Sequence, residues 1–184
     1  MKSLAGFFVG MVGLALAIFS DVAFAAATEC SGVVTGKVVG AVVVNDGDVC
    51  VLGGANVSGG VQVNGGGTLI ACGSTINGGL VANGAAELLV GPEEIGGCLG
   101  NVINGGVHIS DTGPGAPPGE GPPSIGLENN AIRGGVFLTG NAGTINVATN
   151  TIAGGLFCSN NAFDLGDEGR PPNTITGAIT CTFE

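Results

Sequence analysis

A motif repeated seven times limits the possible folds of this 184-residue chain more than any other feature. Each copy starts with a branched apolar residue, here called the anchor, and in most copies a glycine pair stands two and three places after it. Successive anchors are 19, 19, 27, 29, 20 and 23 residues apart, so a base period of 19 with insertions of 8, 10, 1 and 4 residues explains the spacing. The copies occupy residues 38–44, 57–63, 76–82, 103–109, 132–138, 152–158 and 175–181.

Within each copy, apolar residues occupy the anchor and the positions four and six places after it, which is the alternation of a short strand. β-branched residues dominate, and we expect about three short strands per copy. The glycine pairs are expected at corners, where they allow a positive φ and a close approach of neighbouring copies. A second inward pair is expected in most copies: Val49/Val51, Leu69/Ala71, Leu88/Val90, Ile125/Leu127, Ile145/Val147 and Phe163/Leu165.

One such unit cannot bury its own apolar face, so neighbouring copies must stack into a continuous core. The sequence therefore predicts an all-β, single-domain parallel β-helix (a solenoid) of about seven coils of ~19 residues with loop insertions. The period and the irregular insertions favour the right-handed form, because left-handed β-helices keep a strict hexapeptide rhythm. The alternative is an all-β sandwich of the same short strands, which rarely repeats its sequence in register.

The N-terminal residues have the pattern of an export signal. Lys2 gives a positive start, residues 4–19 are continuously apolar, and the "AFA" that ends at Ala25 suits a cleavage site. We expect residues 1–25 to be a signal peptide and residues 26–184 to be the mature β-helix domain, secreted or held at the cell surface. The alternative is a transmembrane anchor, for which the apolar run is short.

Composition narrows the range of partners. The net charge of −10 would repel phosphate backbones, so we expect no binding to nucleic acid, and no integral membrane span is expected after signal cleavage. The chain has no Trp and no Tyr, which predicts an interior of Val, Ile and Leu in narrow layers and offers no obvious platform for stacking sugar rings.

All six cysteines follow the expected cleavage site, and an even number in an exported chain predicts disulfides. Cys158 and Cys181 each lie six places after an anchor, so they should stack and pair. We expect Cys30 to pair with Cys50, placed on an outward position, which leaves Cys72 for Cys98. Metal binding is the alternative, but the chain has no CxxC pair.

Two sets of polar side chains on the predicted strands suggest other roles. A row seven places after successive anchors is expected to form a hydrogen-bonded ladder, with a ligand-binding strip as the alternative: Asn45, Asn64, Asn83, Ser110, Thr139 and Ser159. His108 is expected to point outward as a bystander, since the chain has no second imidazole to share a metal. The sequon at Asn56 overlaps the anchor Val57 and is expected to be fortuitous.

Carboxylates cluster in three turns or loops, and none of these clusters predicts an assembled active site. The pairs are Asp46 with Asp48 and Glu93 with Glu94, and a third group is Asp164, Asp167 and Glu168. Glycoside hydrolysis needs two carboxyl groups facing one bond. The third group is a weak candidate for Ca²⁺ through oxygen ligands. We expect no catalytic residue and no cofactor.

The segments "VSGGVQVNGGGTLIACGSTINGGLVANGA" and "IAGGLFCSNN…NTITGAITC" resemble small exported bacterial glycine-rich repeat proteins, and the chain is distantly similar to bactofilins, which are polymer-forming β-helices. The resemblance implies a parallel β-helix and supplies no site residue. The leading hypothesis is an exported, non-enzymatic structural or adhesive protein of the cell surface or extracellular matrix, bound to a surface glycan, to a matrix polymer or to itself. One alternative is a secreted polysaccharide lyase or glycoside hydrolase that uses loop carboxylates. The other is a self-assembling filament subunit.

Overall fold

The computed structural model describes residues 26–91, 96–113, 124–162, 165–166 and 169–182, and these residues contain strands and no helix. The strands form two sheets, and every strand pair in them is parallel. The first sheet runs in the order β1 (Thr28–Glu29), β3 (Val42–Val44), β5 (Val61–Val63), β8 (Leu80–Asn83), β11 (Val107–Ser110), β14 (Val136–Thr139) and β17 (Leu156–Ser159).

The second sheet has twelve strands and two arms that meet at the long strand β4 (Val49–Val57). β2 (Val33–Val38) pairs with β4 beside this path. One arm contains β6 (Thr68–Cys72), β9 (Glu87–Val90), β12 (Ile125–Glu128), β15 (Ile145–Ala148) and β18 (Leu165–Gly166). The other arm contains β7 (Thr75–Ile76), β10 (Val102–Ile103), β13 (Ala131–Ile132), β16 (Thr151–Ile152) and β19 (Thr174–Ile175).

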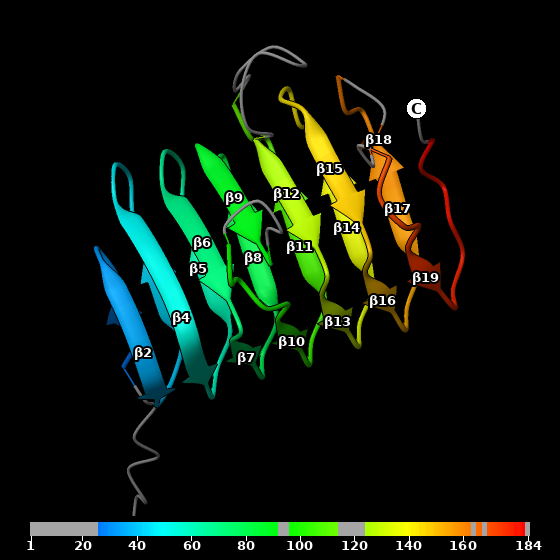
Figure 1. Cartoon of the computed structure of the whole chain (residues 1–184). Helices are drawn as coiled ribbons and strands as arrows, with labels where there is room; N and C mark the ends of the chain where they lie inside the picture. Colours follow the sequence, from blue (N-terminus) through cyan, green and yellow to red (C-terminus); the bar gives the residue numbers. More distant parts are fainter. Residues whose placement is uncertain (1–25, 92–95, 114–123, 163–164, 167–168, 183–184) are drawn as a thin grey trace, which may run out of the picture.

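Strand pairing follows the sequence repeat. In the seven-stranded sheet, the residue four places after one anchor pairs with the residue four places after the next, as in Val61 with Leu80 and Leu80 with Val107. The same sheet is extended at its start by β1, which precedes the first copy. At its end, the seventh copy contributes only an isolated bridge from Ile179 to Leu156. Figure 1 shows the strands stacked side by side from blue to red along the molecule. The observed class is therefore all-β with parallel sheets, and an antiparallel sandwich is excluded.

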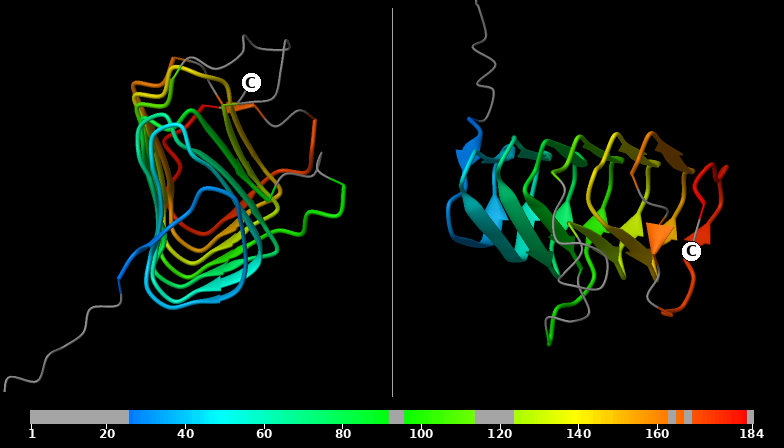
Figure 2. Two further views of the ribbon diagram at one scale, coloured as in Figure 1. Left: turned by 90° about the vertical axis from the view of Figure 1, so that its left-hand side faces the viewer. Right: turned by 90° about the horizontal axis from the view of Figure 1, so that it is seen from above.

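The repeated apolar positions form one continuous core. Anchors and the residues four and six places after them are buried in the first five copies, and the end-on view in Figure 2 shows the chain surrounding a common interior. The last copy differs, because Ile179 is 52% exposed where its equivalents are buried. Among the described strands, none follows Ile179 in the seven-stranded sheet, so no neighbouring strand covers this side chain.

One inward pair was assigned wrongly from the sequence. Cys50 and Leu52 are buried, whereas Val49 is exposed and Val51 only partly buried. Cys50 pairs with Leu69, so these two residues occupy equivalent positions twelve places after their anchors. The expected outward position of Cys50 is therefore wrong. Phe163 lies outside the described residues, and the other expected pairs from Leu69/Ala71 onward are buried.

The glycine pairs have one of the two roles that the sequence suggested, the close approach of neighbouring copies. A positive φ occurs within these pairs at Gly79, at 116°, but the first glycine of each pair after the first copy has no positive φ. Instead, a Cβ atom on Gly105 would lie 2.3 Å from the carbonyl oxygen of Gly78, and one on Gly134 would lie 2.6 Å from Cα of Gly106. The pairs are needed because the backbones of neighbouring copies touch, and the proposed turn with positive φ is wrong for most of them.

Three disulfides join cysteines that lie close in space, with Cα–Cα distances of 5.4, 5.0 and 4.8 Å. They link Cys30 to Cys50, Cys72 to Cys98 and Cys158 to Cys181, the same three pairs that the repeat predicts. Such a set is typical of proteins that mature in an extracellular or otherwise oxidising compartment. Among the residues described, the structure contains no helix able to cross a membrane. The expected signal peptide, residues 1–25, lies outside the described part of the chain.

Candidate functional site

A row of side chains along the outer face of the seven-stranded sheet is the feature of this protein best suited to contact a partner. The middle residue of each strand points outward between two inward residues, as in the buried–exposed–buried pattern of β5. Because the strands are parallel and in register, these middle residues line up across the sheet. We call this set the outer row: Val43, Gln62, Val81, His108, Phe137 and Phe157.

Three rings stack within the outer row. The rings of Phe137 and Phe157 have centroids 4.9 Å apart and are inclined by 14°, and His108 continues the stack at 6.0 Å and 22°. Glycine makes room for these rings, since a Cβ on Gly155 would lie 2.5 Å from Cζ of Phe157 and one on Gly135 3.1 Å from Cε2 of Phe137. The row remains accessible, as Phe137 is 42% exposed and Val81 is 53% exposed.

A groove of about 610 Å³ runs beside the outer row. Gln62, Val81, His108 and Phe137 line it, and glycines from three neighbouring copies, at residues 60, 78–79 and 106, also contribute. We call the consecutive glycine pairs the glycine track: residues 59–60, 78–79, 105–106, 134–135 and 154–155. The volume is within the usual range of ligand sites, and the lining is mainly apolar with few polar groups, as in most such sites.

Asparagine residues directly precede two glycine pairs of the track in the sequence. Asn77 directly precedes one glycine pair and Asn104 the next. Their side chains form an exposed chain of hydrogen bonds, in which Asn104 Nδ2 donates to Asn77 Oδ1 at 2.7 Å and Asn77 Nδ2 donates to Asn56 Oδ1 at 3.3 Å. Asn77 Nδ2 also donates to Val57 O at 3.1 Å, and Asn104 Oδ1 is buried, so these amides are held mainly by one another and by the backbone.

The outer row and its groove are nearly free of formal charge. His108 is the one titratable residue in the outer row, and Glu29 is paired with its first member, Val43. The whole chain, by contrast, has fourteen acidic and four basic residues. None of the acidic residues belongs to the outer row or to the lining of the groove. His108, expected to be a bystander, lies at the junction of the stacked rings and the groove.

The polar row predicted seven places after the anchors forms a ladder in part. Asn64 Nδ2 donates to Asn45 Oδ1 at 3.1 Å, and Asn83 Nδ2 donates to Ser110 Oγ at 3.1 Å. Ser159 Oγ donates to Thr139 Oγ1 at 3.3 Å. Bonds therefore join neighbouring members in pairs, which fits the structural interpretation of this row.

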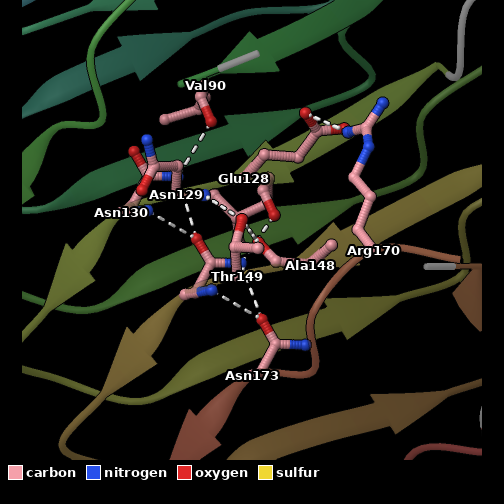
Figure 3. Close-up of polar contacts among 10 residues, drawn as sticks. Val90, Glu128, Asn129, Asn130, Ala148, Thr149, Arg170 and Asn173 are labelled. Atoms are coloured by element: carbon pink, nitrogen blue, oxygen red, sulfur yellow. Dashed lines mark hydrogen bonds and ion pairs between the residues drawn. The ribbon is translucent and has the colours of Figure 1, made fainter. Parts of the chain in front are cut away.

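A second ladder of asparagine side chains is buried, and it was not predicted from the sequence. Asn101, Asn130, Asn150 and Asn173 each stand two places before an anchor, and Figure 3 shows part of this ladder. Asn130 Oδ1 accepts from both the backbone N and Nδ2 of Asn101, while Asn130 Nδ2 donates to Val90 O at 2.8 Å. Asparagine at the same repeat position in four successive copies was the signal that could have revealed it.

One buried ion pair lies near this ladder. Arg170 Nη1 contacts Glu128 Oε2, and both side chains are largely shielded from water (Figure 3). The pair joins the end of β12 to the segment that precedes β19. A buried pair of this kind holds a loop in place only while both partners remain charged, since removing one leaves an uncompensated charge.

The carboxylate clusters expected from sequence do not assemble into a site in the described residues. Asp46 is exposed and Asp48 partly buried at the turn between β3 and β4. The candidate Ca²⁺ ligands Asp164, Asp167 and Glu168, like the pair Glu93 and Glu94, lie outside the described residues. No group of three or more metal-binding side chains is present where the structure is described.

Comparisons of this chain with protein-family models, with curated proteins and with solved structures found no match. The functional interpretation therefore depends on the outer row, the groove beside it and the glycine track.

Proposed function

We propose that this protein is an exported, non-enzymatic structural or adhesive component of the cell surface or extracellular matrix, and that the outer row is its adhesive surface. The observation that carries the proposal is the uncharged row of apolar and aromatic side chains beside a groove of about 610 Å³. Its partner is an extended polymer, either a surface glycan or a matrix polymer, because the row extends over six strands rather than closing around one point.

The proposed architecture behind this surface is a right-handed parallel β-helix of about seven coils. In support of it, each of the first six copies of the repeat adds one strand to the seven-stranded sheet and further strands to the second sheet, all of them parallel. The handedness stays a prediction from the period of 19 residues, as does the relation to exported glycine-rich repeat proteins or to bactofilins. A β-helix suits adhesion because its stacked backbone keeps a long surface rigid, so little ordering entropy is lost on binding.

Export is the second part of the proposal. The expected cleavage after Ala25 and the three disulfides both support secretion or display at the cell surface. N-terminal sequencing of the exported protein should find Ala26 as its first residue. An intact N-terminus on the cell-associated protein would instead support a membrane anchor.

Adhesion can be tested with two matched substitutions. Val81 lies in the outer row, whereas Val49 lies on the second sheet, and their exposed fractions of 53% and 52% are nearly equal. We expect Val81→Asp to weaken binding of the oxidised protein to extracellular material from the producing cells by about tenfold or more, since a carboxylate is desolvated at the contact. Val49→Asp should retain binding. Equal retention by both variants would contradict an adhesive outer row.

An enzymatic role predicts a different result. The oxidised protein should leave a panel of polysaccharides unchanged, and reproducible release of reducing ends or unsaturated products would overturn the non-enzymatic proposal. Light scattering on the same sample tests the filament alternative, which predicts particles much larger than the single chain of 17.6 kDa or its processed form.

A further inference from the structure

We infer that the groove binds an uncharged, β-linked glycan, which lies along the glycine track and across the strands with one sugar per strand. The inference rests on the proposed adhesive function and names the polymer that the outer row holds. It depends on three features of the described residues: the backbone floor of the groove, the chemistry of the side chains that line it, and the spacing of the strands that it crosses.

The floor consists of backbone. The glycine pairs of neighbouring copies are in contact, since a Cβ on Gly78 would lie 2.5 Å from the backbone nitrogen of Gly60. No side chain of the glycine track projects into the groove, so a flat ring can approach the sheet closely there. Glycines of three consecutive copies line the groove, and beyond them the rings of Phe137 and Phe157 lie against Gly135 and Gly155, so the open part of the track has the length of a short oligosaccharide rather than of a single sugar.

The lining of the groove matches the two kinds of surface on a pyranose. A pyranose with equatorial substituents presents apolar C–H faces and a rim of hydroxyl groups. Val81 and the rings of His108 and Phe137 supply apolar surface. Gln62 supplies an amide within the same lining, and its Nε2 donates to Asn64 Oδ1 at 2.8 Å, so its orientation is fixed before a ligand arrives.

Spacing favours a glycan over a polypeptide. Adjacent strands lie about 4.8 Å apart, which is close to the length of one pyranose in an extended β-linked glycan. Equivalent contacts can therefore recur at each strand. An extended polypeptide presents side chains to one face about every 6.7 Å, so it loses register within a few strands. A polyproline helix, with about 9.3 Å per turn, could match only every second strand.

Charge favours an uncharged glycan over an acidic one. The outer row has no lysine or arginine, and the chain as a whole has a net charge of −10. A polymer of uronates or sulfated sugars would meet repulsion at long range and no cation in the outer row to offset it.

The experiment is a calorimetric titration of the oxidised protein with β-1,4-linked glucose and N-acetylglucosamine oligomers of increasing length. We expect affinity to rise with each added sugar up to about three units, the number of copies whose glycines line the groove, and then to level off. Gln62→Ala and Val81→Asp should each weaken binding by about tenfold. Asn83→Ala, an exposed amide that bonds to Ser110, and Val49→Asp are the matched controls and should bind normally. A hexamer of galacturonate should not bind.

Other outcomes separate this inference from the adhesive proposal. If no uncharged glycan binds while Val81→Asp still abolishes adhesion, the glycan is the wrong partner and the adhesive surface stands. Binding of a proline hexamer in place of the sugars would assign the groove to a polypeptide. A dimer that Val81→Asp converts to a monomer would assign the groove to a second copy of the chain. If Val81→Asp changes neither adhesion nor glycan binding, both proposals are wrong.

Discussion

At the scale of single residues, the glycines of the track are positions where a larger residue does not fit. Their requirement is spatial: a side chain there would overlap the backbone of the neighbouring copy. Thr149 shows the opposite situation, because a β-branched residue holds a φ of 56°, a region that such residues rarely enter. Its Oγ1 accepts a hydrogen bond from the backbone of Asn129 at 3.0 Å and donates one to Ala148 O at 2.7 Å, which offsets part of the strain (Figure 3).

The spatial requirement can be measured with two glycine-to-alanine variants. Gly105→Ala should lower the free energy of unfolding by about 1–3 kcal/mol, because its Cβ would lie 2.3 Å from Gly78 O and the sheet would have to shift. Gly96→Ala is the matched control, since a Cβ there has no neighbour within 4 Å. Both substitutions restrict the unfolded chain equally, so the control should be neutral or slightly stabilising. Urea unfolding followed by circular dichroism gives the comparison, and equal midpoints would contradict the close-contact explanation.

At the scale of elements, the buried asparagine ladder satisfies backbone groups at a corner that sheet pairing does not reach. The side chains of Asn101, Asn130 and Asn150 each bond to backbone as well as to a neighbouring amide. The exposed amides of Asn56 and Asn77 form a similar row in contact with water. In both rows, amides of neighbouring copies are hydrogen-bonded to one another. Water can replace a lost hydrogen bond in the exposed row but not in the buried one.

The buried ladder should be much the more costly of the two to interrupt. Asn130→Ala removes the acceptor used by Asn101 and the donor to Val90 O, leaving buried polar groups without partners. We expect a loss of about 3 kcal/mol in the free energy of unfolding. Asn56→Ala, in the exposed row, should lose less than about 1 kcal/mol because water takes the place of the amide. Chemical denaturation of both variants checks this, and similar losses would mean that burial of the ladder adds nothing.

At the scale of the whole molecule, the disulfides act on neighbouring copies rather than on distant parts of the chain. Cys30–Cys50 joins the segment after β1 to β4, and Cys158–Cys181 joins β17 to the segment after β19. In a stack where each copy contacts mainly its neighbours, stability is close to a sum of local terms. Loss of either of these two disulfides should therefore destabilise one end of the molecule and leave the middle copies folded.

Hydrogen exchange can test this local behaviour. The double variant Cys158→Ala/Cys181→Ala should lose about 3 kcal/mol of stability in the last copy, as expected for a closed loop of roughly this size. Amide exchange should accelerate at residues 174–182, where Thr180 N donates to Leu156 O, and stay unchanged in β5 and β8. Cys30→Ala/Cys50→Ala is the matched variant and should accelerate exchange at the opposite end. Uniform acceleration along the chain would show that the stack unfolds as a single unit.

The sequence by itself determined the strand period, the register of the seven-stranded sheet and the pairing of Cys158 with Cys181. It could do so because a repeat places equivalent residues at equivalent heights, and a shift of one residue would turn every apolar side chain outward. Only the tertiary structure decided which contacts equivalent residues of neighbouring copies make with one another. The stacking of His108 on Phe137, the depth of the ladder at Asn130 and the contact between glycine backbones all depend on distances across copies. Such distances are set by packing, which a linear pattern does not contain.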